Sequence, residues 1–150
     1  MPIALPPIET ASGSDWPAIL ALLGGVGLPI ADLGHDRPIE FRVARAADGQ
    51  LVGSVGIEGH GIERLIRSLA VAPALRGHGL GSALLEAAEA WARSAGVTRL
   101  YLLTLTPAFF DRRGYTPVAR DAVPAAVAAS EEFSRLCPAA AACLTRRLGD

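Results

Sequence analysis

The sequence contains no lysine, and all 14 of its basic residues are arginine. The missing amine excludes the lysine of a Walker A phosphate loop, a pyridoxal Schiff base and any lysine nucleophile. An excess of charge of one sign is also lacking, because 15 acidic residues leave a net charge of −1. We therefore expect no nucleic-acid partner and no attraction to an anionic membrane.

Long hydrophobic runs are absent as well. The longest uncharged run, Trp16–Ala31, is too short for a typical membrane span and is interrupted by glycines and a proline. The first ten residues carry prolines and no basic residue, which is unlike a secretory signal. A cytoplasmic protein without a membrane partner is the expectation.

Cysteine and histidine are scarce. Cys137 and Cys143 are accompanied only by three scattered histidines, and their spacing fits no common zinc site. We therefore expect no metal. We interpret both cysteines as buried apolar thiols rather than as a disulfide or a metalloid site.

What the chain does have is a 51% hydrophobic composition over 150 residues, enough for one full core and too apolar for a disordered chain. Hydrophobic periodicity predicts an α+β fold in a single domain, residues 1–150. Asp48-Gly49 predicts a hairpin turn, and strict alternation would place Leu65, Arg67, Leu69 and Val71 on one face. The expected strands are Ile3–Ile8, Ile39–Ala46, Leu51–Glu58, Glu63–Val71, Arg99–Leu105, Tyr115–Ala119 and Ala141–Arg146. The expected helices are Asp15–Leu23, Gly79–Gly96, Pro107–Arg113 and Pro124–Leu136, with a turn or short helix at Pro29–Leu33.

The most informative local pattern is a glycine-rich loop between a strand and the long helix. Its residues are Arg76, Gly77, His78, Gly79, Leu80, Gly81 and Ser82. Where glycines remove side chains, backbone N–H groups can converge on an anion, and the positive end of the helix dipole adds to the attraction. The expected ligand is a phosphate or pyrophosphate. Two other interpretations stand beside it: a dinucleotide-binding turn, whose third glycine would be replaced by Ser82, and a plain turn.

Together with the surrounding strands, this loop resembles the GNAT family of acyl-CoA-dependent N-acyltransferases. The family signature of Arg or Gln, two residues, Gly, one residue, Gly or Ala is supplied by Arg76, Gly79 and Gly81, after a strand ending in Leu69-Ala70-Val71. The resemblance implies a mixed, mostly antiparallel sheet flanked by helices, with two splayed strands forming the acyl-CoA cleft. It also implies acetyl-CoA as co-substrate, with its pyrophosphate on the amides of residues 76–82. Leu69, Ala70 and Val71 would pair with the pantetheine arm, and one backbone N–H would polarise the thioester.

The proton-transfer groups depart from the common family pattern. Phe110 stands where many members carry a tyrosine that protonates the leaving thiolate, so it can line the coenzyme site but cannot donate a proton. Thr104 is then a candidate donor beside water. Glu58 and Glu63 are the carboxylates of the central strands, and we favour Glu58 as the base, against the interpretation of both as solvated charges.

Arg67 is a candidate for binding the acceptor substrate. It stays protonated, and its guanidinium can hold a carboxylate in bidentate geometry. The alternative is an arginine that pairs with an internal acidic residue and joins two strands. On the first interpretation the acceptor carries a carboxylate, as an amino acid does.

A narrower resemblance concerns GNAT proteins associated with bacterial arsenic-resistance operons, which are similar to amino-acid N-acetyltransferases. The segments that carry it include Val55-Gly56-Ile57-Glu58, Leu65-Ile66-Arg67-Ser68-Leu69 and Tyr101-Leu102-Leu103-Thr104. It implies direct acetyl transfer to the amino group of an amino acid or of an arsenic- or phosphorus-containing glutamate analogue. A non-catalytic acyl-CoA sensor on the same scaffold is the alternative. The resemblance to the family also favours a homodimer.

Overall fold

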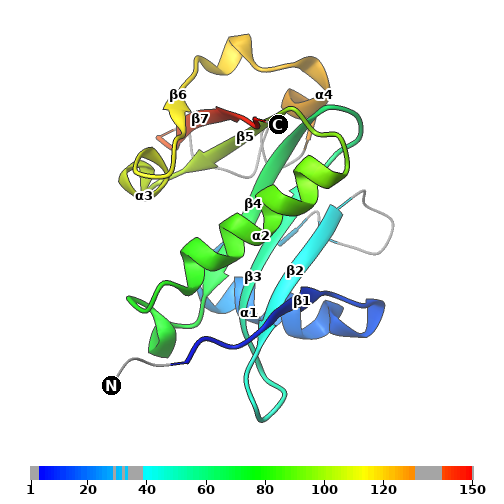
Figure 1. Cartoon of the computed structure of the whole chain (residues 1–150), viewed down its shortest axis with the longest axis vertical. Coiled ribbons are helices and arrows are strands. Elements are labelled where there is room, and N and C mark those ends of the chain that lie inside the picture. The colour runs from blue at the N-terminus through cyan, green and yellow to red at the C-terminus, as the bar shows by residue number, and fades with distance from the viewer. Residues whose placement is uncertain (1–3, 29, 32, 34–38, 131–139, 150) are drawn as a thin grey trace.

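The strands of the molecule form one mixed sheet. The computed structural model describes residues 4–28, 30–31, 33, 39–130 and 140–149. In this part of the chain the sheet has seven strands in the order β1-β2-β3-β4-β5-β7-β6 (Figure 1). Only β4 and β5 are parallel, and the other neighbouring pairs are antiparallel. The strands are β1 (Ile8–Thr10), β2 (Ile39–Arg45), β3 (Leu51–Glu58), β4 (Glu63–Val71), β5 (Arg99–Thr104), β6 (Thr116–Pro117) and β7 (Ala142–Arg147).

Two helices cover opposite faces of the sheet's first half (Figure 1). Helix α2 (Leu80–Ser94) buries one apolar face against β3 and β4, with Leu84 and Leu85 in one core cluster with Val55 and Ile66. Helix α1 (Trp16–Gly25) packs Ile19 and Leu23 against β2 in a second cluster. The short helices α3 (Pro107–Asp111) and α4 (Ala125–Ala128) accompany the second half of the sheet. No described helix has the length and apolar character needed to cross a membrane.

The elements predicted in the middle of the chain are confirmed, whereas the first strand, predicted at Ile3–Ile8, is displaced toward Thr10, and the strand and helix predicted at Tyr115–Ala119 and Pro124–Leu136 are too long. Strand β1 begins only at Ile8, because Pro6 and Pro7 lack the N–H groups that a ladder needs. Strand β6 is limited to Thr116–Pro117, and the described part of α4 ends at Ala128. The predicted extension of that helix through residues 131–136, Cys137, and residues 29 and 32 of the predicted turn lie outside the described residues.

Strand β4 contains a β-bulge that overturns the predicted alternation. Ser68 has a φ of 59°, and the register moves from Gly56 opposite Arg67 to Ser54 opposite Ala70. Two residues of β4 therefore oppose Val55 alone, which reverses the side-chain phase. Leu69 now packs in the α2 cluster, whereas Arg67 lies on the α1 face, opposite Gly56, which in turn lies opposite Phe41 on β2. The prediction that Leu65, Arg67, Leu69 and Val71 share a face was wrong.

A buried polar network ties α2 to the second half of the sheet. Tyr115 is fully buried and donates its hydroxyl proton to Glu89 Oε2 over 2.8 Å, and Arg146 Nη1 donates to the same oxygen over 2.8 Å. Desolvation raises the pKa of Tyr115, so the hydroxyl remains a donor. This network fixes the chain directly after α3, which forms one wall of the site described below.

Cys143 is buried in a third cluster with Leu65 and Tyr101, as the sequence predicted. Burial raises the pKa of its thiol. A buried thiol with little thiolate is unreactive, which agrees with a packing role.

Candidate functional site

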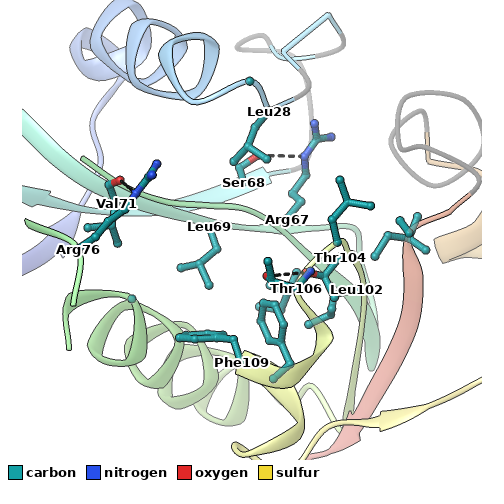
Figure 2. Close-up of a pocket in the computed structure, with 17 residues that line it drawn as sticks. Leu28, Arg67, Ser68, Leu69, Val71, Arg76, Leu102, Thr104, Thr106 and Phe109 are labelled. Carbon is teal, nitrogen blue, oxygen red and sulfur yellow. Dashed lines mark hydrogen bonds between the residues drawn. The ribbon is translucent and has the colours of Figure 1, made fainter. Parts of the chain in front are cut away.

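A cleft opens where β4 and β5 separate. The two strands pair only over Glu63–Leu65 and Arg99–Tyr101, and β5 then continues to pair with β7 as far as Thr104. This is the predicted splay. The space between the strands is a cavity of about 650 Å³. In Figure 2, Arg76 lies at one end of its lining and Arg67 toward the other, with Leu69 between them.

The glycine loop forms the floor of a second cavity of about 380 Å³. Both cavities are lined by Val71, Arg76, Gly81 and Phe109, so they adjoin. Gly77 and Gly79 have φ values of 82° and 88°, a region that favours glycine over other residues. Helix α2 begins without a side-chain cap, and its first backbone bond is Ala83 N to Gly79 O. The amides of residues 80–82 are thus without helical partners, as an anion site at a helix N-terminus requires.

Two arginines border this loop. Arg76 is exposed and donates from Nε to the carbonyl of Val71 over 3.3 Å. Arg113 is half-buried, with its guanidinium stacked 3.8 Å from the centroid of Phe109. It donates from Nε to Ser82 Oγ over 3.2 Å and from Nη1 to the Phe109 carbonyl over 2.6 Å. In the described part of the chain neither guanidinium has a carboxylate partner, so positive charge is concentrated beside the free amides.

The structure distributes the predicted coenzyme residues unevenly. Leu69, Val71, Arg76, Gly81 and Phe110 line the large cavity. Gly77, Gly79, Leu80 and Ser82 line the second one, whereas Ala70 packs on the α1 side and His78 is exposed outside both. Sequence reasoning missed Phe109 and Arg113. The only signal for the latter was the pair Arg112-Arg113, and the fold decides which of the two faces the cavity.

The backbone of β4 offers polar groups to the large cavity. Ala72 N donates to Val52 O on β3 over 2.8 Å. Because successive residues of a strand direct their backbone groups to opposite sides, Leu69 and Val71 direct theirs away from β3, toward the space that β5 has left. Acceptance of the Arg76 bond by the Val71 carbonyl agrees with this. A ligand in the cleft can therefore pair with β4 as a missing strand would.

The other end of the cavity contains a buried ion pair. Arg67 is 3% exposed and lines the cavity, and its Nη1 lies 2.8 Å from Glu58 Oε1. Its Nε donates to Ser68 Oγ over 3.2 Å (Figure 2). Glu58 is 7% exposed and does not line the cavity. The two interpretations of Arg67 are thus both represented, since it joins two strands and also faces the cleft. Glu63, the other carboxylate considered, accepts from the Tyr101 hydroxyl over 3.1 Å.

Thr104 lines the cavity at the end of β5. Its Oγ1 accepts the backbone N–H of Thr106 over 2.9 Å and lies 3.2 Å from Thr106 Oγ1 (Figure 2). Phe110 is buried, with its ring edge-on to Phe109 and Tyr115. Among the described residues, no three His, Cys, Asp or Glu side chains are arranged to hold a metal ion.

Comparison with known proteins identifies the family. Residues 22–115 match the acetyltransferase (GNAT) family. The chain belongs to the GNAT family. It is 38% identical over 77 residues to an uncharacterised N-acetyltransferase of Chlorobaculum tepidum, a match covering 51% of this chain and 50% of the relative. It is 36% identical over 72 residues to the amino-acid acetyltransferase of Mycobacterium tuberculosis, covering 48% of this chain and 38% of that protein. The aligned regions thus span half or less of these GNAT relatives.

Among solved structures, the GNAT chain is similar to N-acetylglutamate synthase from Neisseria gonorrhoeae in complex with coenzyme A and N-acetyl-glutamate. The TM-score is 0.79 at 25% identity, over 99% of this chain and 36% of the synthase. A Mycobacterium tuberculosis protein, Rv2747, solved in complex with CoA and NLQ, shares the fold, with a TM-score of 0.73 at 24% identity over 96% of this chain and 100% of that one.

Proposed function

We propose that this GNAT domain transfers an acetyl group from acetyl-CoA to the amino group of a small acceptor. The observation that carries the proposal is the union of two adjoining cavities. One has helix amides without helical partners and two arginines that pair with no carboxylate among the described residues, and the other is an open-strand cleft. A ligand that is anionic at one end and extended at the other suits this arrangement. The similar synthase holds coenzyme A.

In this proposal the pyrophosphate of the coenzyme lies on the amides of residues 77–82, between Arg76 and Arg113. The pantetheine arm pairs with the backbone of Leu69 and Val71, and the thioester reaches the bulge. Gly81 and Phe109 line both cavities, and a Cβ at Gly81 would come into van der Waals contact with the Phe109 ring at 3.5 Å, so the glycine leaves space between them. No metal is required for this chemistry.

The reaction is a direct attack of the neutral amine on the thioester carbonyl. Holding both substrates in one cleft supplies proximity, and a backbone N–H of β4 stabilises the oxyanion. The attacking nitrogen gives one proton to water as the amide forms, and the sulfur leaves as a thiolate, whose free pKa of about 8.5 makes it a tolerable leaving group. Because Phe110 cannot donate a proton, we assign donation to water or to Thr104, whose hydroxyl oxygen already accepts the Thr106 N–H.

The acceptor end is assigned to Arg67 and Glu58. Arg67 faces the cavity and can hold a carboxylate of the acceptor, which favours an amino acid. The names of the relatives, an amino-acid acetyltransferase and an N-acetylglutamate synthase, support this class. Glu58 lies behind Arg67 and outside the cavity, so its position supports orientation of the guanidinium better than proton transfer. An arsenic- or phosphorus-containing glutamate analogue is a narrower proposal that rests on the sequence resemblance alone.

An acetyl-CoA thiol-release screen over amino acids and glutamate analogues tests this function. We expect turnover above background with at least one amino acid that carries a free α-carboxylate. The matched control is its amide, which has the same amine but no carboxylate for Arg67. If acetyl-CoA binds but none of the acceptors is turned over, the protein is a coenzyme-binding sensor and not an enzyme.

A further inference from the structure

A buried serine holds the bulge of β4 from behind. Ser54 lies in the middle of β3, is 0% exposed, and donates its hydroxyl proton to the carbonyl of Ser68 over 2.8 Å. Ser68 is the one non-glycine residue at positive φ in the described part of the chain. Such a conformation persists where the surroundings hold it, and Ser54 is a contact that does so.

The geometry of one peptide unit links this hydrogen bond to the cleft. In a trans peptide the C=O of one residue and the N–H of the next point in opposite directions. Because the Ser68 carbonyl points to Ser54 on β3, the Leu69 N–H points away from β3. The alternation counted from the Ala72 to Val52 bond gives the same direction. Strand β5 pairs with β4 only as far as Leu65, so this N–H faces the open cleft.

We propose that Ser54 is a positioning residue for the acetyl transfer. The role rests on the function proposed above: the Ser54 hydroxyl fixes the Ser68–Leu69 peptide, so that the Leu69 N–H points at the thioester oxygen. Ser54 lines neither cavity and acts only through this peptide. Without its bond, the peptide has freedom to rotate about the bulge, and the oxyanion donor is no longer preorganised. Preorganisation of such donors is what lowers the barrier in acyl transfer.

The competing explanation is that Ser54 merely satisfies two buried polar groups. Thr145 provides a matched control for it. Its hydroxyl also donates to a backbone carbonyl inside the sheet, that of Leu100 over 2.9 Å, and it is 7% exposed. Thr145 lies on β7 and does not line the large cavity. A purely structural role predicts that Ser54→Ala and Thr145→Val behave alike.

The test combines kinetics with infrared difference spectra of acetyl-CoA labelled with ¹³C at the thioester carbonyl, bound to the whole chain. In the wild type we expect the carbonyl stretch to lie below its value in water. Ser54→Ala should return it part of the way and lower kcat about tenfold, less than the 10²–10³-fold loss of an entire oxyanion donor. The KM for acetyl-CoA should change less than about twofold, because the phosphate contacts that supply binding energy are untouched. Thr145→Val should lower Tm and change neither quantity.

Ser54→Cys guards against loss of folding, since a thiol retains a weak donor; its frequency and kcat should fall between those of Ser54→Ala and the wild type. The inference is overturned if Ser54→Ala leaves the carbonyl frequency at its wild-type value, or if Thr145→Val reproduces the effect. A wild type that binds acetyl-CoA without turnover would refute the proposed function alone, because the infrared shift still decides the role of Ser54.

Discussion

Replacing Arg113 by methionine tests the phosphate end of the site. The substitution keeps an unbranched side chain beside Phe109 and removes the guanidinium. Arg113 is already ordered by its stack on Phe109 and its bonds to Ser82 and the Phe109 carbonyl, so little side-chain entropy is lost when a phosphate binds. A hydrogen bond to a charged group contributes about 1.5–3 kcal/mol. At about 1.4 kcal/mol per decade, Kd for coenzyme A should rise roughly 10- to 100-fold.

The neighbouring Arg112 supplies the control. Its side chain is exposed and makes no hydrogen bond or ion pair in the described part of the chain. Arg112→Met removes the same formal charge from the same helix end, so it reports the long-range field alone. We expect titration calorimetry to show less than about a threefold change for it, because exposed charges are screened within about 10 Å at 0.1 M salt.

Two ligands locate the contact. Dephospho-CoA lacks the 3′-phosphate, and Arg113→Met should weaken it by the same factor as coenzyme A if the pyrophosphate is the partner. S-acetylpantetheine carries no phosphate and should bind the wild type and Arg113→Met with equal affinity. Equal losses for Arg112→Met and Arg113→Met, or a loss that persists with S-acetylpantetheine, would refute the assignment.

Four further substitutions test other parts of the structure. Gly79→Val forces a β-branched residue into a φ of 88° and places its side chain over the loop. Coenzyme affinity measured by calorimetry should therefore fall at least 100-fold. An unchanged affinity would contradict the phosphate site. Arg67→Gln should raise the KM of the acceptor at least tenfold and change the KM of acetyl-CoA little; equal effects on both KM values would make Arg67 structural. Glu58→Gln should raise the KM of the acceptor by a smaller factor and leave the pH–rate profile unchanged. Because burial raises the pKa of Cys143, its thiol carries less thiolate than a free cysteine at pH 8, and in a Cys137→Ser chain Ellman's reagent should react only as the protein unfolds.

The sequence was sufficient where structure is decided locally. The Asp48-Gly49 turn fixes the first hairpin, with Gly49 at a φ of 89°, and the period of α2 identifies its buried stripe. The splayed cleft followed from the family resemblance. The glycine loop could be recognised as a candidate anion site because its signal is contained in seven consecutive residues.

What escaped prediction depends on contacts that form only when the chain folds. Ser68 carries no mark of a left-handed residue, and the bulge exists only because β3 opposes β4 with one residue fewer. Pairing of Arg67 with an internal acidic residue was one of the two interpretations of its role, but the partner was not identified, because Glu58 lies nine residues away and meets Arg67 only once the hairpin has closed. Arg112 and Arg113 are neighbours in the turn after α3, and only the folded turn shows that Arg113 is the one that stacks on Phe109 and contacts Ser82.

The bulge also makes chain length a property that this part of the fold must conserve. A substitution on either side of Ser68 alters one contact on one face. Deleting one residue between Arg67 and Leu69 would instead restore a regular strand, in which one of the two halves has to turn over. Either Arg67 would leave the face that it shares with Glu58, or Leu69 and Val71 would leave the α2 core and the cleft. In β4 a change of one residue in length is therefore a rearrangement of both faces of the sheet, however conservative the remaining sequence.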